Sequence, residues 1–154
     1  QACRQKGIKP ILGCEFYLSH TDCTIRSEEN RSLSHLCVLA KNRKGWDNLI
    51  QAVSKSNDEE NYYYKPRLDL AELNLFADGN LIAYSGHLGS DLANAIFVDP
   101  KSAYNAKTEE EAKRYTHPNW DSEVLKIANR YRTIFGKENF FIGSSRSTIY
   151  SQKV

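Results

Sequence analysis

Short apolar runs alternate with amphipathic helical segments along most of the chain, and this alternation is what most restricts its fold. The apolar runs are dense in β-forming side chains and cover residues 8–18, 35–40, 81–84 and 140–142. The segments between them carry apolar residues at helical spacing. Strands that alternate with helices predict a mostly parallel sheet with helices outside it, which is an α/β layer or barrel.

Capping residues mark where the helices are expected to begin. Asn42, Asp69 and Ser122 each precede an amphipathic segment, and a side-chain oxygen at such a position can accept a hydrogen bond from the first helical turn. A further short helix fits residues 90–97 and is expected to end before Pro100.

Two polar stretches interrupt the pattern. Residues 19–34 hold no apolar period, and we expect them to form a long loop. Residues 101–119 are the most polar region and predict a helical or loose surface excursion. Both look like insertions between the elements of one domain.

The composition describes an ordinary globular chain, with 40% apolar and 26% charged residues. A net charge of +2 provides no strong field for steering nucleic acid, so any DNA contact must come from local patches. No apolar run approaches the roughly 20 residues needed to cross a bilayer. No signal-peptide pattern is visible either. We therefore expect a cytoplasmic protein with no membrane contact.

The chain starts at Gln1 and contains no methionine, so we expect it to be an internal piece of a longer protein. Its four cysteines show no Cys-x-x-Cys pairing. In a cytosolic setting this favours free thiols over disulfides or a zinc finger.

Three residues at strand termini could carry chemistry: Glu15, His35 and His87. Functional groups gather where strands of α/β folds end, and imidazole together with carboxylate suits Zn²⁺, Mn²⁺ or Fe. Each also has an ordinary interpretation, since a histidine often satisfies backbone groups and Glu15 can lie on a solvated strand face. In a simple parallel sheet His35 and His87 would face opposite ends, unless the chain returns as a hairpin after Leu18.

Lys65, Arg67 and the three tyrosines before them form a basic and aromatic segment. Such residues contact phosphate backbones or stack on bases in single-strand channels. The alternative interpretation is packing across the mouth of a barrel.

Five segments of the chain resemble successive segments of one family, in that family's order. They read GIKPILGCEFYL, HLCVLAKNRKGWDNLIQAVSKSN, YYKPRLDL, GNLIAYSGHLGSDLANAIF and FGKENFF. The family is the PHP domain of the bacterial C-family DNA polymerase III α subunit. The resemblance runs from about Gly7 to Phe141.

This resemblance implies an α/β fold of the PHP type: an irregular, TIM-like β/α barrel that is incomplete here. Residues 1–154 would then be the central portion of a PHP domain, with polar insertions at about 19–34 and 101–119 and a divergent tail at about 143–154. The family's opening and closing ligand segments are expected to lie outside the chain.

The resemblance also implies a metal site. Glu15 matches a carboxylate that bridges metals, His35 matches the histidine that opens the HLxxLA strand, and His87 matches a position occupied by Cys or His. The expected cofactors are divalent ions, Zn²⁺ or Mn²⁺, with Mg²⁺ for a parent polymerase. With the other ligand positions missing, we expect the fragment alone to be inactive.

The expected parent is a replicative DNA-directed DNA polymerase, to which this region contributes a metal-dependent phosphoesterase such as a 3′–5′ exonuclease. Its partners would be DNA and other replicase subunits, including a proofreading exonuclease. Two alternatives stay open. The domain could be a scaffold with a vestigial metal site that docks a proofreading subunit, or a stand-alone phosphatase of small phosphate esters.

Overall fold

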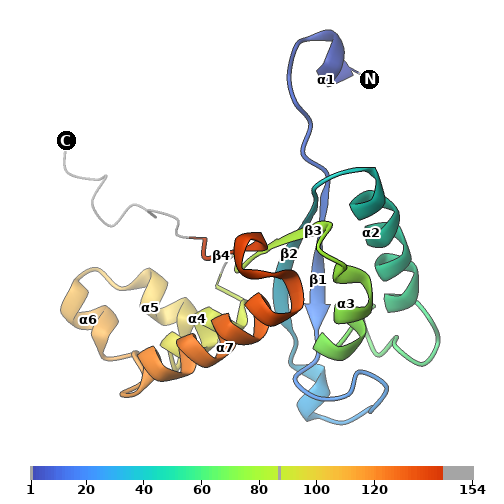
Figure 1. Cartoon of the computed structure of the whole chain (residues 1–154). Helices are drawn as coiled ribbons and strands as arrows, with labels where there is room; N and C mark the ends of the chain where they lie inside the picture. Colours follow the sequence, from blue (N-terminus) through green and yellow to red (C-terminus); the bar gives the residue numbers. More distant parts are fainter. Residues whose placement is uncertain (1, 87, 144–154) are drawn as a thin grey trace.

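The computed structural model describes residues 2–86 and 88–143, which form a four-stranded sheet with helices beside it (Figure 1). The strands, in their order across the sheet, are β1 (Gly13–Leu18), β2 (Ser34–Ala40), β3 (Leu81–Tyr84) and β4 (Phe140–Phe141). The α-helices are α1 (Ala2–Gln5), α2 (Arg43–Ser56), α3 (Leu70–Ala77), α4 (Asp91–Ile96), α5 (Pro100–Asn105), α6 (Glu109–Lys113) and α7 (Trp120–Phe135). Two short 3₁₀ helices are η1 (Glu29–Arg31) and η2 (Lys137–Asn139).

The strand directions correct the prediction of a mostly parallel sheet. β1 pairs with β2 and β2 with β3 in antiparallel fashion, and the β3–β4 pair is parallel. The loop of residues 19–34 returns the chain beside β1 as a wide hairpin, which apolar content alone cannot reveal because it says nothing about strand direction. The described residues thus form an α/β fold with a mixed, open sheet, and a closed TIM-like barrel is not seen among them.

One face of the sheet forms the core. Along β1 and β2 the buried side chains alternate with less buried ones, as expected for a strand with one covered face. Helices α2, α3 and α7 supply the other half of the core. The buried cluster includes Phe16, Leu18, Leu36, Val38, Leu49, Ala52, Leu73, Leu81, Ala83, Tyr131, Phe135 and Phe140.

The opposite face of the sheet has a different character, and we call it the open face. Its side chains are half-buried or exposed and include Glu15, Tyr17, His35, Cys37 and Tyr84. This face carries carboxylate, imidazole, thiol and phenol groups, which can bind metal ions or transfer protons.

Local signals predicted most helix starts correctly. The Asn42 side chain accepts a hydrogen bond from Gly45 N, and Asp69 accepts one from Glu72 N. The short helix expected at residues 90–97 is present as α4, which ends at Ile96, before Pro100 as predicted, and Pro100 itself begins α5. Its fixed φ and missing N–H suit the first turn of a helix as well as a stop.

Three further sequence expectations concern the last long helix, the second polar stretch and the cysteines. The helix α7 begins at Trp120, before the predicted cap Ser122. The polar stretch 101–119 is largely helical, since it holds most of α5 and all of α6. All four cysteines are free thiols, as predicted. Among the described residues, no helix combines the length and apolarity that crossing a membrane demands.

Candidate metal centre

Glu15 and His35 meet on the open face of the sheet. The antiparallel register pairs Glu15 with Cys37 and Tyr17 with His35, so Glu15 and His35 are diagonal neighbours on adjacent strands. His35 Nδ1 lies 2.6 Å from Glu15 Oε1. The His35 side chain is 24% exposed and that of Glu15 43%, so solvent reaches both. Two of the predicted ligands are therefore brought together at an accessible position.

The imidazole of His35 is oriented from two sides. The Glu15 carboxylate contacts Nδ1, and the ring of Tyr17 lies edge-on to the imidazole with centroids 4.7 Å apart and an interplanar angle of 82°. A carboxylate on one ring nitrogen is a common way to set the tautomer and direction of a metal-binding histidine.

The turn after β3 approaches the same end of β2. His35 N donates to Gly89 O over 2.9 Å. On the other side of the turn, a Cβ added to Gly86 would lie 3.2 Å from Cys37 Sγ, and Gly86 has a φ of +72° that favours glycine. The predicted ligand His87 itself lies outside the described residues. Because β2 and β3 are antiparallel, the start of β2 and the end of β3 share one end of the sheet.

The chain matches the model of the PHP domain over residues 1–147. It belongs to the PHP domain family. The resemblance found in the sequence is thereby confirmed.

The PHP domain is also similar to parts of much longer proteins. It is 32% identical over 150 residues to the DNA polymerase III subunit alpha of Helicobacter pylori, which covers 97% of this chain and 11% of that protein. It is 35% identical over 144 residues to that of Treponema pallidum, covering 92% of this chain and 10% of the relative. It is 30% identical over 156 residues to that of Campylobacter jejuni, and the match covers 100% of this chain and 12% of the relative. The chain thus spans about a tenth of these curated relatives.

Lys65 lies close to the Glu15–His35 pair of the PHP domain. Its Nζ is 4.3 Å from the centre of the Tyr17 ring, which contacts His35. Ammonium over an aromatic face is a favourable cation–π arrangement. The Lys65 side chain is exposed, so it provides a positive charge beside the candidate centre.

Arg67 does not fit its predicted contact with substrate. Its side chain is fully buried, and its guanidinium donates to the carbonyl oxygens of Asn30 at 2.8 Å and Ile25 at 3.0 Å. Tyr63 stacks against it, with the guanidinium carbon 4.8 Å from the ring centre. Burial lowers the pKa of Arg67 from its ordinary value because it disfavours the charged form. In this placement Arg67 anchors the loop of residues 19–34 and cannot reach a phosphate.

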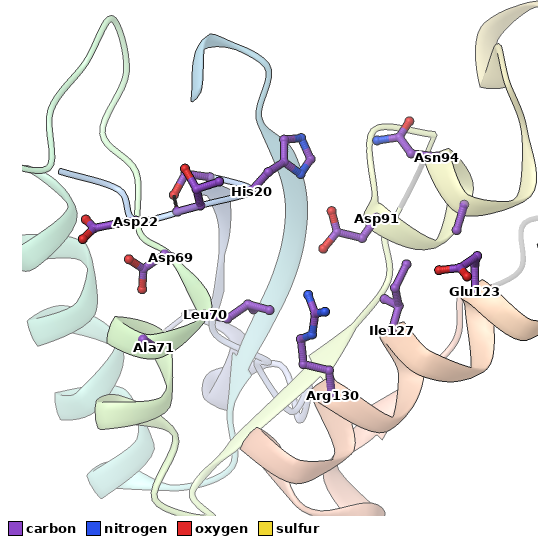
Figure 2. A pocket seen from close by; sticks show the side chains of 13 residues that line it. His20, Asp22, Asp69, Leu70, Ala71, Asp91, Asn94, Glu123, Ile127 and Arg130 are labelled. Atoms are coloured by element: carbon purple, nitrogen blue, oxygen red, sulfur yellow. Dashed lines mark hydrogen bonds between the residues drawn. The ribbon is translucent and has the colours of Figure 1, made fainter. Parts of the chain in front are cut away.

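Sequence reasoning missed a second group of potential ligands. One ligand atom each from Asp22, Cys23 and Asp69 lies within 4.8 Å of the others. Asp22 and Asp69 border a cavity of about 740 Å³, which Figure 2 shows. The side chains that face each other across this cavity include His20, Asp22 and Asp69 on one side and Asp91, Glu123 and Arg130 on the other.

The contacts within this group tie the loop after β1 to the start of α3. Asp69 caps α3 and also accepts from Cys23 N at 3.1 Å, while Cys23 Sγ donates to Glu72 Oε2 over 2.9 Å. Burial, followed by the hydrogen bond to Glu72, raises the pKa of the Cys23 thiol well above its ordinary value. A protonated thiol is a poor metal ligand. We therefore treat the group as an anchor for the loop. No local pattern could have revealed it, because Cys23 and its partners are far apart in sequence.

Proposed function

We propose that this PHP domain carries a divalent-metal-dependent phosphoesterase site, such as a 3′–5′ exonuclease, within a replicative DNA polymerase. The observation that carries the proposal is the 2.6 Å contact between Glu15 Oε1 and His35 Nδ1 on the open face. The similarity to DNA polymerase III subunit alpha of several bacteria supports the second half of the proposal.

The chemistry of the two residues fits a divalent ion. Carboxylate oxygen and imidazole nitrogen are donors that suit Zn²⁺ or Mn²⁺, and both side chains keep access to solvent. Such an ion, when bound, lowers the pKa of water and offsets negative charge that develops on a phosphoester. Glu15 would contribute a carboxylate oxygen to the ion, and His35 would contribute an imidazole nitrogen.

Two side chains do not complete a coordination shell, and we propose His87 as a third ligand. Support comes from its neighbours, since Gly86 lies beside Cys37 and Gly89 accepts from His35 N. Lys65 would meet a phosphate oxygen of the substrate, because its ammonium group lies one aromatic ring away from His35.

We extend the proposal to the longer protein on the strength of its relatives. Its substrate would be DNA, its polymerase reaction would use Mg²⁺, and it would work in the cytoplasm with other replicase subunits, including a proofreading exonuclease. The rest of an irregular β/α barrel would cover the open face and supply the remaining ligands. An exposed Phe141 and a half-buried Tyr84 on that face are consistent with such a cover.

A second candidate function is a scaffold whose metal site is vestigial. The specific observation in its favour is that Glu15 and His35 contact each other directly, so the pair needs no ion to satisfy its polar groups. Such a domain would brace the polymerase and dock a proofreading subunit. A stand-alone phosphatase would need the same ligands but no polymerase sequence beside them.

The test begins with the coding sequence on either side of this chain and continues with the longer protein that it encodes. We expect polymerase sequence to follow, and the purified protein to release nucleotides from a 3′ end with Mn²⁺ or Zn²⁺ but not with EDTA. Glu15→Gln should reduce this rate at least about tenfold, because a ligand is lost. The matched control is Glu110→Gln, which alters an exposed carboxylate on α6.

Two results would decide against the proposal. A protein that binds no divalent ion and hydrolyses nothing, yet retains polymerase activity, would establish the scaffold. Hydrolysis that survives unchanged in Glu15→Gln would show that the reaction takes place elsewhere.

A further inference from the structure

A strained turn displays an aromatic ring next to the candidate centre. Tyr63 N donates to Lys65 O over 3.2 Å, which leaves Tyr64 at the tip with a φ of +61°. A bulky residue rarely adopts this left-handed conformation, and such strain clusters at ligand-binding sites. The Tyr64 side chain is 66% exposed. We call residues 62–65 the aromatic turn.

Neighbouring groups hold the aromatic turn in place. The guanidinium carbon of Arg31 lies 4.8 Å from the centre of the Tyr64 ring, and both carboxylate oxygens of Glu28 accept from Arg31 Nη1, at 2.8 and 2.9 Å. The Tyr63 ring packs against Tyr64 with centroids 4.6 Å apart, and it rests in turn on the buried Arg67. The exposed ring therefore contacts a second ring in a T-shaped arrangement, and that second ring rests on a buried guanidinium.

The aromatic turn is joined to the edge of the sheet. Leu68 N donates to Tyr17 O over 3.1 Å and Ser19 N donates to Leu68 O over 2.9 Å, so the segment after the turn runs along β1. Lys65 then reaches over the Tyr17 ring, and Tyr17 contacts His35. A row of contacts from Lys65 through Tyr17 to His35 thus leads from the aromatic turn to the Glu15–His35 pair.

The charges around the row favour an anionic chain. Arg31 lies against the exposed Tyr64 ring and remains 48% exposed despite its pairing with Glu28, and Lys65 is the exposed residue next in the chain. Of the three acidic residues before the turn, Asp58 and Glu60 form ion pairs with Lys55, over 3.3 Å for Asp58.

We propose that the aromatic turn is a stacking platform for single-stranded DNA, on which a base lies against Tyr64 while Arg31 and Lys65 contact the phosphates. The proposal rests on the proposed function, since it names the form of the substrate and the direction from which its end arrives. Stacking on an exposed ring tolerates any base, and a duplex keeps its bases inside its own stack. The turn would therefore select single strands.

The test uses the 154-residue chain and a fluorescein-labelled oligothymidylate, with binding followed by anisotropy at low salt in EDTA. Tyr64→Gly should weaken binding about fivefold or more, because one stacking contact is lost. Its melting temperature should not fall by more than a few degrees, since glycine accepts a φ of +61° without strain. Tyr64→Phe should bind like the wild type. Tyr104→Ala, a change at an exposed tyrosine on α5, is the matched control.

The proposal is overturned if the wild type does not bind the oligonucleotide, if Tyr64→Gly binds as tightly as the wild type, or if a duplex binds equally well with the same dependence on Tyr64. Measuring Glu15→Gln in parallel separates this proposal from the previous one. In the longer protein that contains this chain, that variant should lose divalent metal but keep its affinity for the oligonucleotide. Oligonucleotide binding by a longer protein that binds no metal would sink the proposed function and uphold the platform.

Discussion

The backbone amide of His35 donates a hydrogen bond to the carbonyl oxygen of Gly89 over 2.9 Å. This bond joins the start of β2 to the turn that follows β3. Because those strands are antiparallel, the residues that open one and close the other gather at one end of the sheet. The candidate centre depends on this arrangement, which a parallel sheet would not allow.

Metal binding should depend on the two residues that meet there. We expect Glu15→Gln and His35→Ala each to weaken binding of Zn²⁺ or Mn²⁺ at least about tenfold, since each removes one donor. Isothermal titration calorimetry on the longer protein that contains this chain, comparing each variant with the wild type, measures this directly. His117→Ala is the matched control for an imidazole. Asp22→Asn should leave the affinity unchanged; a loss in that variant instead would assign the ion to the group around Cys23.

Removing the Arg67 side chain should destabilise the fold. Arg67→Met keeps much of the side-chain volume but removes the Arg67 donor from Asn30 O and one of two donors from Ile25 O, which also accepts from Asn30 Nδ2. We expect a loss of about 2–4 kcal/mol in the free energy of unfolding, because buried unpaired acceptors are costly. Urea denaturation followed by circular dichroism measures it. The same change at exposed Arg132 should stay within about 0.5 kcal/mol.

Gly45→Ala should destabilise the protein although alanine is the better helix former. A Cβ at this position of α2 would lie 2.1 Å from Asn80 O. The backbone at Asn80 cannot move aside without disturbing the start of β3, which begins at the next residue. We expect a net cost of about 1–3 kcal/mol, which exceeds the helical gain of about 1 kcal/mol. Ser54→Ala, at an exposed position of the same helix, should be neutral or slightly stabilising. A Gly45→Ala variant as stable as the wild type would contradict this close approach.

The raised pKa of Cys23 predicts how stability changes in alkaline solution. In the unfolded chain the thiol ionises near a pH of about 8.5, whereas burial and Glu72 keep it protonated in the fold. Its contribution to stability is therefore complete below that pH and is lost as pH rises, by about 1.4 kcal/mol per pH unit. Chemical denaturation at pH 8, 9 and 10 measures the slope. Cys23→Ala should be less stable at pH 8 but show a shallower decline; an identical slope would be evidence against a protonated, buried thiol.

Helix starts that are fixed by neighbouring residues could be predicted from the sequence. Asn42 and Asp69 cap their helices as predicted, since a side-chain oxygen and a nearby N–H are all that a cap requires. Which residues of a helix face the core was harder to predict than where the helix lies. Leu49 and Ile50 are adjacent apolar residues of α2, yet Leu49 is buried and Ile50 is 46% exposed. How much of an apolar helix face is buried depends on the neighbouring element that covers it. The spacing of apolar residues along the helix does not reveal that neighbour.

By itself, the sequence determined the strands and most helices, the free thiols, membership of the PHP domain family and the identity of Glu15 and His35 as candidates, because these follow from residue types at short range and from matched segments. Only the tertiary structure decided that β1 and β2 pair in antiparallel fashion, that Glu15 and His35 touch, and that Arg67 lies inside. Those outcomes depend on contacts between segments far apart in the chain, whose geometry is set by the packing of the whole domain.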